Sequence, residues 1–157
     1  MKSLIVKIII CASLCVALGT ASGFSTIDSI TNWYQFLNKP TFNPPNWIFG
    51  PVWTLLYLLM GIAVALIWHT PHPDKKRALQ LFVAQFVLNL AWSYIFFNLH
   101  ELGLAFVEII TLLIVIIFTI VAFYKINRKA AFLMIPYLCW VSFASVLNFS
   151  IWFLNRG

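Results

Sequence analysis

Long apolar stretches separated by short polar segments occupy almost the whole of this 157-residue chain. A helix needs about 20 mostly apolar residues to cross the hydrocarbon core of a bilayer. Five stretches meet that requirement, at residues 4–22, 46–68, 78–98, 103–124 and 130–154. The pattern predicts an all-α integral membrane protein, with residues 1–157 forming a single domain built as a five-transmembrane-helix bundle. A content of 62% hydrophobic and 9% charged residues agrees, since it leaves too little polar surface for a soluble domain.

The first stretch has a second interpretation. Lys2 and Lys7 flank the start of an apolar core at residues 8–18, which is followed by the small residues Gly19 and Ala21. That order is also typical of a secretory signal peptide. The pattern alone leaves a retained helix and a cleaved leader both open, and cleavage would leave four spans.

Basic residues are distributed unevenly between the two ends of the predicted spans. Lys39 and Arg156 fall on one side, and the other side holds Lys2, Lys7, Lys75, Lys76, Arg77, Lys125, Arg128 and Lys129. Because basic loops stay in the cytoplasm, we expect the amino terminus and the loops at 69–77 and 125–129 there, in a multi-pass protein of a bacterial plasma membrane. Orientation and contact with anionic lipid then explain the net charge of +6, so no nucleic-acid partner is expected.

The segment between the first two spans is rich in proline and tryptophan. It reads WYQFLNKPTFNPPNWIFGPVW from Trp33 to Trp53. Each of its prolines lacks an N–H and restricts the residue before it. We therefore predict a shaped loop that forms an outward-facing lid and fixes where the second span begins.

Polar and aromatic residues form stripes at helical spacing inside three spans. The stripes are Trp53 and Tyr57 on the second span, Gln85, Asn89 and Trp92 on the third, and Trp140, Ala144, Asn148 and Trp152 on the fifth. Each stripe should face protein or a cavity, because an unpaired amide in hydrocarbon costs on the order of several kcal/mol. A rise of about 1.5 Å per residue places most of these side chains at one level, with Trp33 and Tyr34 of the lid above them.

The shared level predicts a cavity walled by indoles and phenols, which suits a large, flat, mostly apolar ligand. Plain helix packing is the alternative for Trp53, Trp92 and Trp140. The tryptophans nearer the span ends are expected to belong to the aromatic belt at the membrane surface.

Other candidate chemistry is sparse. Glu108 is the only acid inside a predicted span, and we expect its side chain to reach the outer interface or a polar neighbour. His69, His72 and His100 lie in or beside loops on opposite sides of the membrane. The sequence therefore predicts neither a metal site nor hydrolytic machinery, and no cofactor is required.

Four motifs, in order along the chain, resemble the translocator protein family, also called tryptophan-rich sensory proteins or peripheral benzodiazepine receptors. They are WYQFLNKPTFNPPNWIFGPVWTLLYLLMG, QFVLNLAWSYIFF, GLAFVE and PYLCWVSFASVLNFSIWFLN. The resemblance implies a retained first helix, a homodimer and a ligand cavity beneath the first loop. The family's ligands are porphyrins such as protoporphyrin IX, haem, sterols in the animal members, and synthetic benzodiazepine-type compounds.

The resemblance also assigns roles to individual positions. Trp53 and Trp140 match the paired tryptophans implicated in light-driven porphyrin breakdown by bacterial members of the family, which makes them the catalytic pair of a photochemical hypothesis. Phe149 replaces the tyrosine of the family's sterol-recognition element, and Arg156 lies farther downstream than that element allows, which argues against a sterol ligand. Glu108 stands where the family usually has an aspartate, so an acid is kept.

The stripes, the lid and the resemblance together give one set of expected ligand-binding residues. They are Trp33, Tyr34, Trp53, Tyr57, Asn89, Trp92, Trp140, Ala144, Leu147 and Asn148. The predicted function is a membrane receptor or sensor that binds tetrapyrroles, with light-dependent porphyrin degradation as its only expected chemistry. The alternative is a transporter of porphyrins or other small hydrophobic molecules.

Overall fold

The computed structural model describes all 157 residues and contains only helices and the segments that connect them. The long helices are α1 (Lys2–Phe24), α3 (Asn46–His69), α4 (Lys75–Ser93), α5 (Leu102–Ile126) and α7 (Ile135–Asn155). The short elements are α2 (Ile27–Asn32), the 3-10 turn η1 (Tyr34–Phe36), the π-helical turn η2 (Tyr94–Asn98) and α6 (Arg128–Leu133). Five helical segments are long and apolar enough to cross a membrane, which confirms the predicted all-α bundle with five spans.

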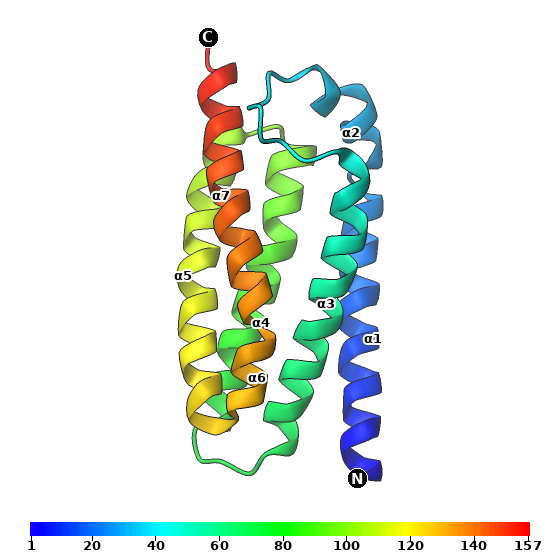
Figure 1. Ribbon diagram of the computed structural model, residues 1–157, viewed down its shortest axis with the longest axis vertical. Helices are drawn as coiled ribbons and strands as arrows, with labels where there is room; N and C mark the ends of the chain where they lie inside the picture. The colour runs from blue at the N-terminus through cyan, green and yellow to red at the C-terminus, as the bar shows by residue number, and fades with distance from the viewer.

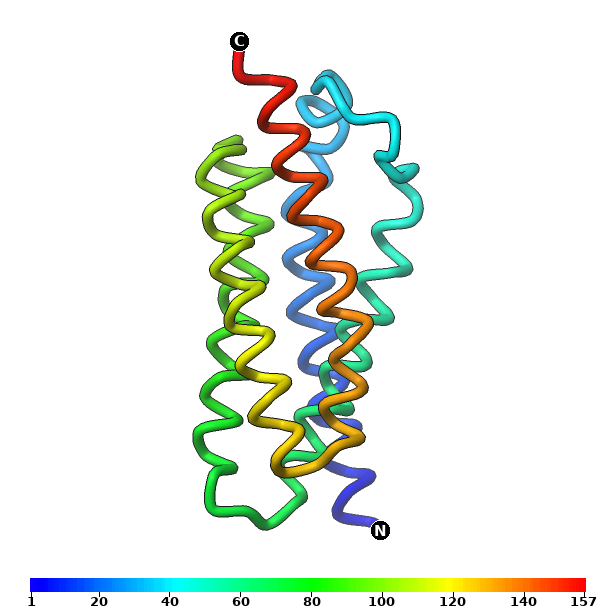
Figure 2. Tube along the Cα trace, turned by 60° about the vertical axis from the view of Figure 1, so that its left-hand side comes forward, coloured from blue at the N-terminus to red at the C-terminus, as the bar shows by residue number.

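The five long helices run side by side along the longest axis of the molecule (Figure 1). The amino terminus, the α3–α4 connection and the α5–α6 connection lie at one end. The carboxyl terminus and the segment from α2 to the start of α3 lie at the opposite end, as the turned view also shows (Figure 2). The predicted lid therefore sits at the end of the bundle remote from most of the basic residues.

Helix α1 is attached to the bundle through close packing against α3. A Cβ added to Gly61 would collide with the backbone of Ala12, and one added to Gly19 would collide with the ring of Tyr57. These two glycines allow the helices to approach one another closely, as small residues do in membrane bundles. Only 17% of the apolar window of α1 is buried, against 44% for α3, so α1 forms the outermost wall.

The main core lies between α3, α4, α5 and α7. Its largest fully buried side chains include Met60, Ile109, Leu112, Phe123 and Tyr137. These residues come from three different helices, so the core fixes their relative positions and gives the cavity above it a rigid base.

Helix boundaries differ from the prediction in three places. The expected helix at 130–154 is two helices, α6 and α7, because Pro136 has no N–H to donate to the preceding turn. The expected helix at 78–98 begins earlier, at Lys75, and its last turn is the wider π-helical η2. The loop that was predicted to start at Trp33 is preceded by a six-residue helix, α2, and residues 25–45 together are called the lid below. Helix α3 does begin at Asn46, directly after Pro44 and Pro45, as predicted.

Candidate functional site

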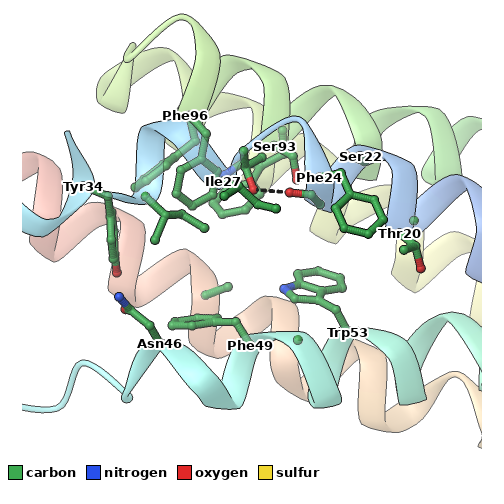
Figure 3. A pocket seen from close by; sticks show the side chains of 18 of the residues that line it. Thr20, Ser22, Phe24, Ile27, Tyr34, Asn46, Phe49, Trp53, Ser93 and Phe96 are labelled. Atoms are coloured by element: carbon green, nitrogen blue, oxygen red, sulfur yellow. Dashed lines mark hydrogen bonds between the residues drawn. The ribbon is translucent and has the colours of Figure 1, made fainter. Parts of the chain in front are cut away.

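A cavity of about 350 Å³ lies in the lid half of the bundle, bounded by α1, α3, α4, α7 and the lid. Figure 3 shows Phe49 and Trp53 projecting from α3 toward Phe24 and Ile27 on the opposite wall. The lining residues are Gly19, Thr20, Ser22, Gly23, Phe24, Thr26, Ile27, Ile30, Tyr34, Asn46, Phe49, Gly50, Trp53, Thr54, Tyr57, Trp92, Ser93, Phe96, Phe97, Trp140, Ala144, Leu147, Asn148 and Ile151. None of them carries a charged side chain, so the cavity favours uncharged parts of a ligand.

Indole rings dominate the wall formed by α3 and α7. The rings of Trp53 and Trp140 have centroids 6.5 Å apart and are nearly perpendicular, at 89°. Trp53 also stacks on Tyr57 at 5.6 Å, and Phe49 meets Trp140 edge to face at 5.9 Å. These rings present flat apolar surfaces at several angles, which suits a planar aromatic ligand.

Trp92 is fixed in the wall by hydrogen bonding to α7. Its indole Nε1–H donates to Asn148 Oδ1 at 2.9 Å, and Asn148 Nδ2–H donates to the carbonyl of Leu102 at 3.0 Å. The amide of Asn148 therefore joins α4, α5 and α7 at one level. By contrast, the buried indole N–H of Trp140 has no partner within the protein. This N–H is also closed off from the cavity, so a ligand could bond to it only if the surrounding side chains moved.

Asn89 lies beneath the cavity and does not line it. Its Oδ1 accepts from the hydroxyl of Tyr57 at 2.6 Å, and its Nδ2–H donates to the hydroxyl of Tyr137 at 2.9 Å. All three side chains are buried. The structure thus places Asn89 outside the lining, because its amide joins α3, α4 and α7 below the site. A contact between Asn89 and a ligand stays a prediction.

Trp33 also does not line the cavity, although the sequence placed it in the roof. Its ring stacks on the imidazole of His100 at 4.0 Å and 15°, and meets Phe96 edge to face at 5.9 Å. Tyr34, the next residue, does line the cavity. Successive residues in this turn point to different sides, so only one of the two aromatic rings can face the ligand.

Tyr34 is the aromatic roof residue. Its hydroxyl donates to Asn43 Oδ1 at 3.0 Å, within the lid, and the ammonium of Lys39 lies 4.7 Å from the centre of its ring. Burial raises the pKa of this phenol, and the hydrogen bond to Asn43 opposes the rise in part. The phenol is therefore an uncharged part of the roof at physiological pH.

Eight of the ten expected ligand-binding residues thus line the cavity, namely Tyr34, Trp53, Tyr57, Trp92, Trp140, Ala144, Leu147 and Asn148. The residues that sequence reasoning missed come mainly from the end of α1 and from α2. Their signal was weak, because this segment carries small and aliphatic residues with no polar stripe. On α3 the signal was present, since Phe49 precedes Trp53 by four residues on the same helical face.

Glu108 does not behave as expected. Both of its carboxyl oxygens are buried and neither has a hydrogen-bond partner, so the side chain neither reaches the interface nor bonds to a polar neighbour. It is also absent from the cavity lining. The three histidines are outside the lining as well, and no cluster of three or more potential metal ligands occurs.

A bundle of five spans with an aromatic, uncharged cavity under a lid defines a multi-pass membrane protein with a cavity between its helices. Residues 11–153 match the model of the TspO/MBR family, and the chain belongs to that family. The sequence resemblance to the translocator protein family is therefore confirmed.

Relatives from all three domains of life match most of the chain. The tryptophan-rich protein TspO of Archaeoglobus fulgidus is 43% identical over 151 residues, which cover 96% of this chain and 98% of that protein. The tryptophan-rich protein TspO of Chlorobaculum tepidum is 41% identical over 157 residues, covering 99% of each chain. The human translocator protein is 38% identical over 128 residues, covering 80% of this chain and 76% of the human protein.

Proposed function

We propose that this protein is a membrane receptor or sensor that binds tetrapyrroles, such as protoporphyrin IX or haem, in the cavity beneath its lid. The observation that carries the proposal is the pair of indoles, Trp53 and Trp140, whose perpendicular rings border an uncharged cavity. A tetrapyrrole offers a large planar face on which such rings can stack. The names of the relatives, which include a tryptophan-rich sensory protein of Cereibacter sphaeroides, support a sensory role.

The size and charge of the cavity define how such a ligand would lie. A volume of about 350 Å³ is at the lower end of the range of about 300–1,000 Å³ for drug-sized ligands. A tetrapyrrole would therefore be enclosed only in part. The exposed lining residues Thr20 and Phe24 on one side and Gly50 and Thr54 on the other favour protrusion between α1 and α3. Because the lining has no cation, the carboxylates of the porphyrin would remain at this opening.

A titration with protoporphyrin IX, followed by quenching of tryptophan fluorescence, tests the proposal. Trp53→Phe and Trp140→Phe are expected to weaken binding as well as quenching, because both indoles form the wall. Trp47→Phe is the matched control, since Trp47 is 73% exposed and lies outside the lining. Unchanged affinity in both cavity variants would refute the assigned site, and absence of binding by the parent protein would refute the function.

Light-dependent porphyrin degradation is the second candidate function. It is favoured by the two adjacent indoles of Trp53 and Trp140, which are oxidisable groups within reach of the same bound ring. Illumination of the purified protein with protoporphyrin IX in air is the test. The hypothesis fails if the two Trp→Phe variants, at saturating porphyrin, degrade it as fast as the parent protein does.

The direction of the protein in the membrane is part of the same proposal. Eight of the ten basic residues lie at the end opposite to the lid, which favours a cytoplasmic amino terminus and an outward-facing lid.

We infer a homodimer as well, through the outer face of α4, where Ala84 is exposed between lipid-facing valines. Light scattering of the protein in mild detergent measures the oligomeric state directly.

A further inference from the structure

The two ends of the lid are attached to the rest of the bundle by different contacts, and between them Tyr34 packs against Phe96 and Phe97 and Phe42 against Phe143. At its far end, the Asn155 side chain at the end of α7 accepts from the Asn38 N–H at 3.0 Å and donates to the Asn38 carbonyl at 2.8 Å. At its near end, α2 and Trp33 rest on the turn that connects η2 to α5. The first attachment consists of two paired hydrogen bonds between uncharged groups, so we expect it to be insensitive to pH.

The near attachment centres on His100. Its imidazole stacks on Trp33 at 4.0 Å, and its Nε2 lies 3.4 Å from the hydroxyl oxygen of Ser29 on α2. A second long contact joins Asn98 Nδ2 to the carbonyl of Ser25, also at 3.4 Å. The imidazole therefore contacts this end of the lid through both a ring stack and a side-chain contact.

The backbone at His100 is unusual. It has a φ of 58°, and His100 is the only non-glycine residue with positive φ in the chain. Few side chains adopt this left-handed conformation, although histidine does so more readily than bulky or β-branched residues. The turn around it is closed by bonds from the Leu99 N–H to the Tyr94 carbonyl and from the Glu101 N–H to the Ile95 carbonyl. The strained residue is thus held in a fixed position with its imidazole against the lid.

Histidine changes its charge between pH 5 and 8. A protonated imidazole over the face of an indole is attracted by the ring quadrupole, as other cations are. The titratable groups of the adjoining elements are Asp28 on α2 and Glu101 in the turn, and neither forms a salt bridge with His100. Neither α2 nor the turn carries a lysine or an arginine. No cation of these elements opposes a positive charge on the imidazole, and such a charge would strengthen the contact with Trp33.

The contact controls a part of the lid that covers the cavity. Thr26, Ile27 and Ile30, which belong to α2 or its N-cap, line the cavity, as does Tyr34 directly after Trp33. Loss of the Trp33–His100 stack would loosen α2 and its N-cap. Tyr34 would stay packed against Phe96 and Phe97, and the bonds between Asn38 and Asn155 would keep the far end of the lid in place.

We propose that His100 is a latch for the lid, which closes on Trp33 when its imidazole is protonated and loosens when the imidazole is neutral. The latch does not need a ligand in order to close. The consequence for ligand release rests on the proposed function, since it concerns a tetrapyrrole in the cavity.

Hydrogen exchange of residues 26–37 in the empty protein tests the latch without any ligand. The parent, His100→Phe and Asn155→Ala proteins are compared at the same pH values, so that intrinsic exchange rates cancel. We expect protection in the parent to be about two- to fivefold higher at pH 5.5 than at pH 8, the range for an exposed cation over an indole. His100→Phe keeps a ring but cannot titrate, and should show no such change. Asn155→Ala loosens the far end and should retain the pH dependence.

The dissociation rate of protoporphyrin IX is the second measurement. In the parent, dissociation should be slower at pH 5.5 than at pH 8 by a similar factor. In His100→Phe this difference between the two pH values should be lost. An unchanged pH dependence of lid protection in His100→Phe, or full protection in Trp33→Leu, would overturn the latch. If lid protection responds as expected but no porphyrin binds, the latch stands and the proposed ligand is wrong.

Discussion

Replacing Asn89 by leucine should destabilise the bundle while leaving the ligand cavity nearly intact. The substitution keeps the shape of the side chain but removes both of its hydrogen bonds, at 2.6 Å to Tyr57 and at 2.9 Å to Tyr137. Interhelical hydrogen bonds in membrane proteins contribute about 0.6 kcal/mol on average and at most about 1.7 kcal/mol. Two such bonds, with two phenols left buried and unpaired, give an expected loss of about 1–3 kcal/mol.

The free energy of unfolding can be measured by titration with sodium dodecyl sulfate in mixed micelles. Gln85→Met is the matched control, because Gln85 lies one turn earlier on the same face of α4 and is also fully buried. The side-chain oxygen of Gln85 has no hydrogen-bond partner. Its side-chain Nε2–H donates only to the sulfur of Met60, at 3.8 Å. The control should therefore cost less than Asn89→Leu.

Ligand binding distinguishes a structural role of Asn89 from a direct contact. Because Asn89 lies outside the lining, Asn89→Leu should change the affinity for protoporphyrin IX by no more than about threefold, or about 0.7 kcal/mol. A stability loss no greater than that of Gln85→Met would refute the hydrogen-bond argument. A tenfold loss of affinity with unchanged stability would show that Asn89 contacts the ligand after all.

Two further predictions concern stability. Gly61→Ala should lower the free energy of unfolding by about 1–3 kcal/mol, because the added methyl group meets the backbone of Ala12. The control is Gly50→Ala on the same helix, whose methyl group meets no atom within 4 Å. An equal effect of the two substitutions would contradict this account of α1 packing. Glu108→Gln should leave the free energy of unfolding unchanged within about 0.5 kcal/mol or raise it, because neither carboxyl oxygen has a partner to lose; a loss above 1 kcal/mol would reveal a partner for Glu108 in the membrane.

The spans and most of the cavity wall could be predicted from the sequence because each rests on a local signal. Hydropathy determines where a helix can cross the membrane, and all five spans follow it. An amide or indole within a span must find a protein partner, so the stripes through Trp92 and Asn148 identified faces that do meet, at 2.9 Å. The start of α3 followed from Pro44 and Pro45, since a residue before proline avoids the helical conformation.

The parts that were not predicted depend on tertiary contacts. Periodicity placed Asn89 on the correct face but could not tell a residue that lines the cavity from one that lies a turn beneath it. The contribution of α1 was not predicted, because a wall of glycine, threonine, serine and a single phenylalanine has no distinctive spacing. The direction of Trp33 depends on His100, which is 67 residues away in the sequence and follows the π-helical turn η2. No local pattern brings these two residues together.

The hydrogen bonds between helices divide the cavity into a rigid wall and a movable one. Side-chain bonds join α3 to α4, α4 to α7 and α7 to α5 through Asn89 and Asn148. No residue of α1 shares a hydrogen bond with any of these helices, so α1 is held by packing and by the ammonium of Lys7, which lies 5.0 Å from the centre of the Trp68 ring on α3. The lid continues directly from α1, and its near end rests on the His100 contact. A ligand that must displace part of the protein to enter will therefore displace α1 and the near end of the lid, because that movement breaks the fewest buried hydrogen bonds. The tryptophans stay in place on the opposite wall, already positioned for the ligand.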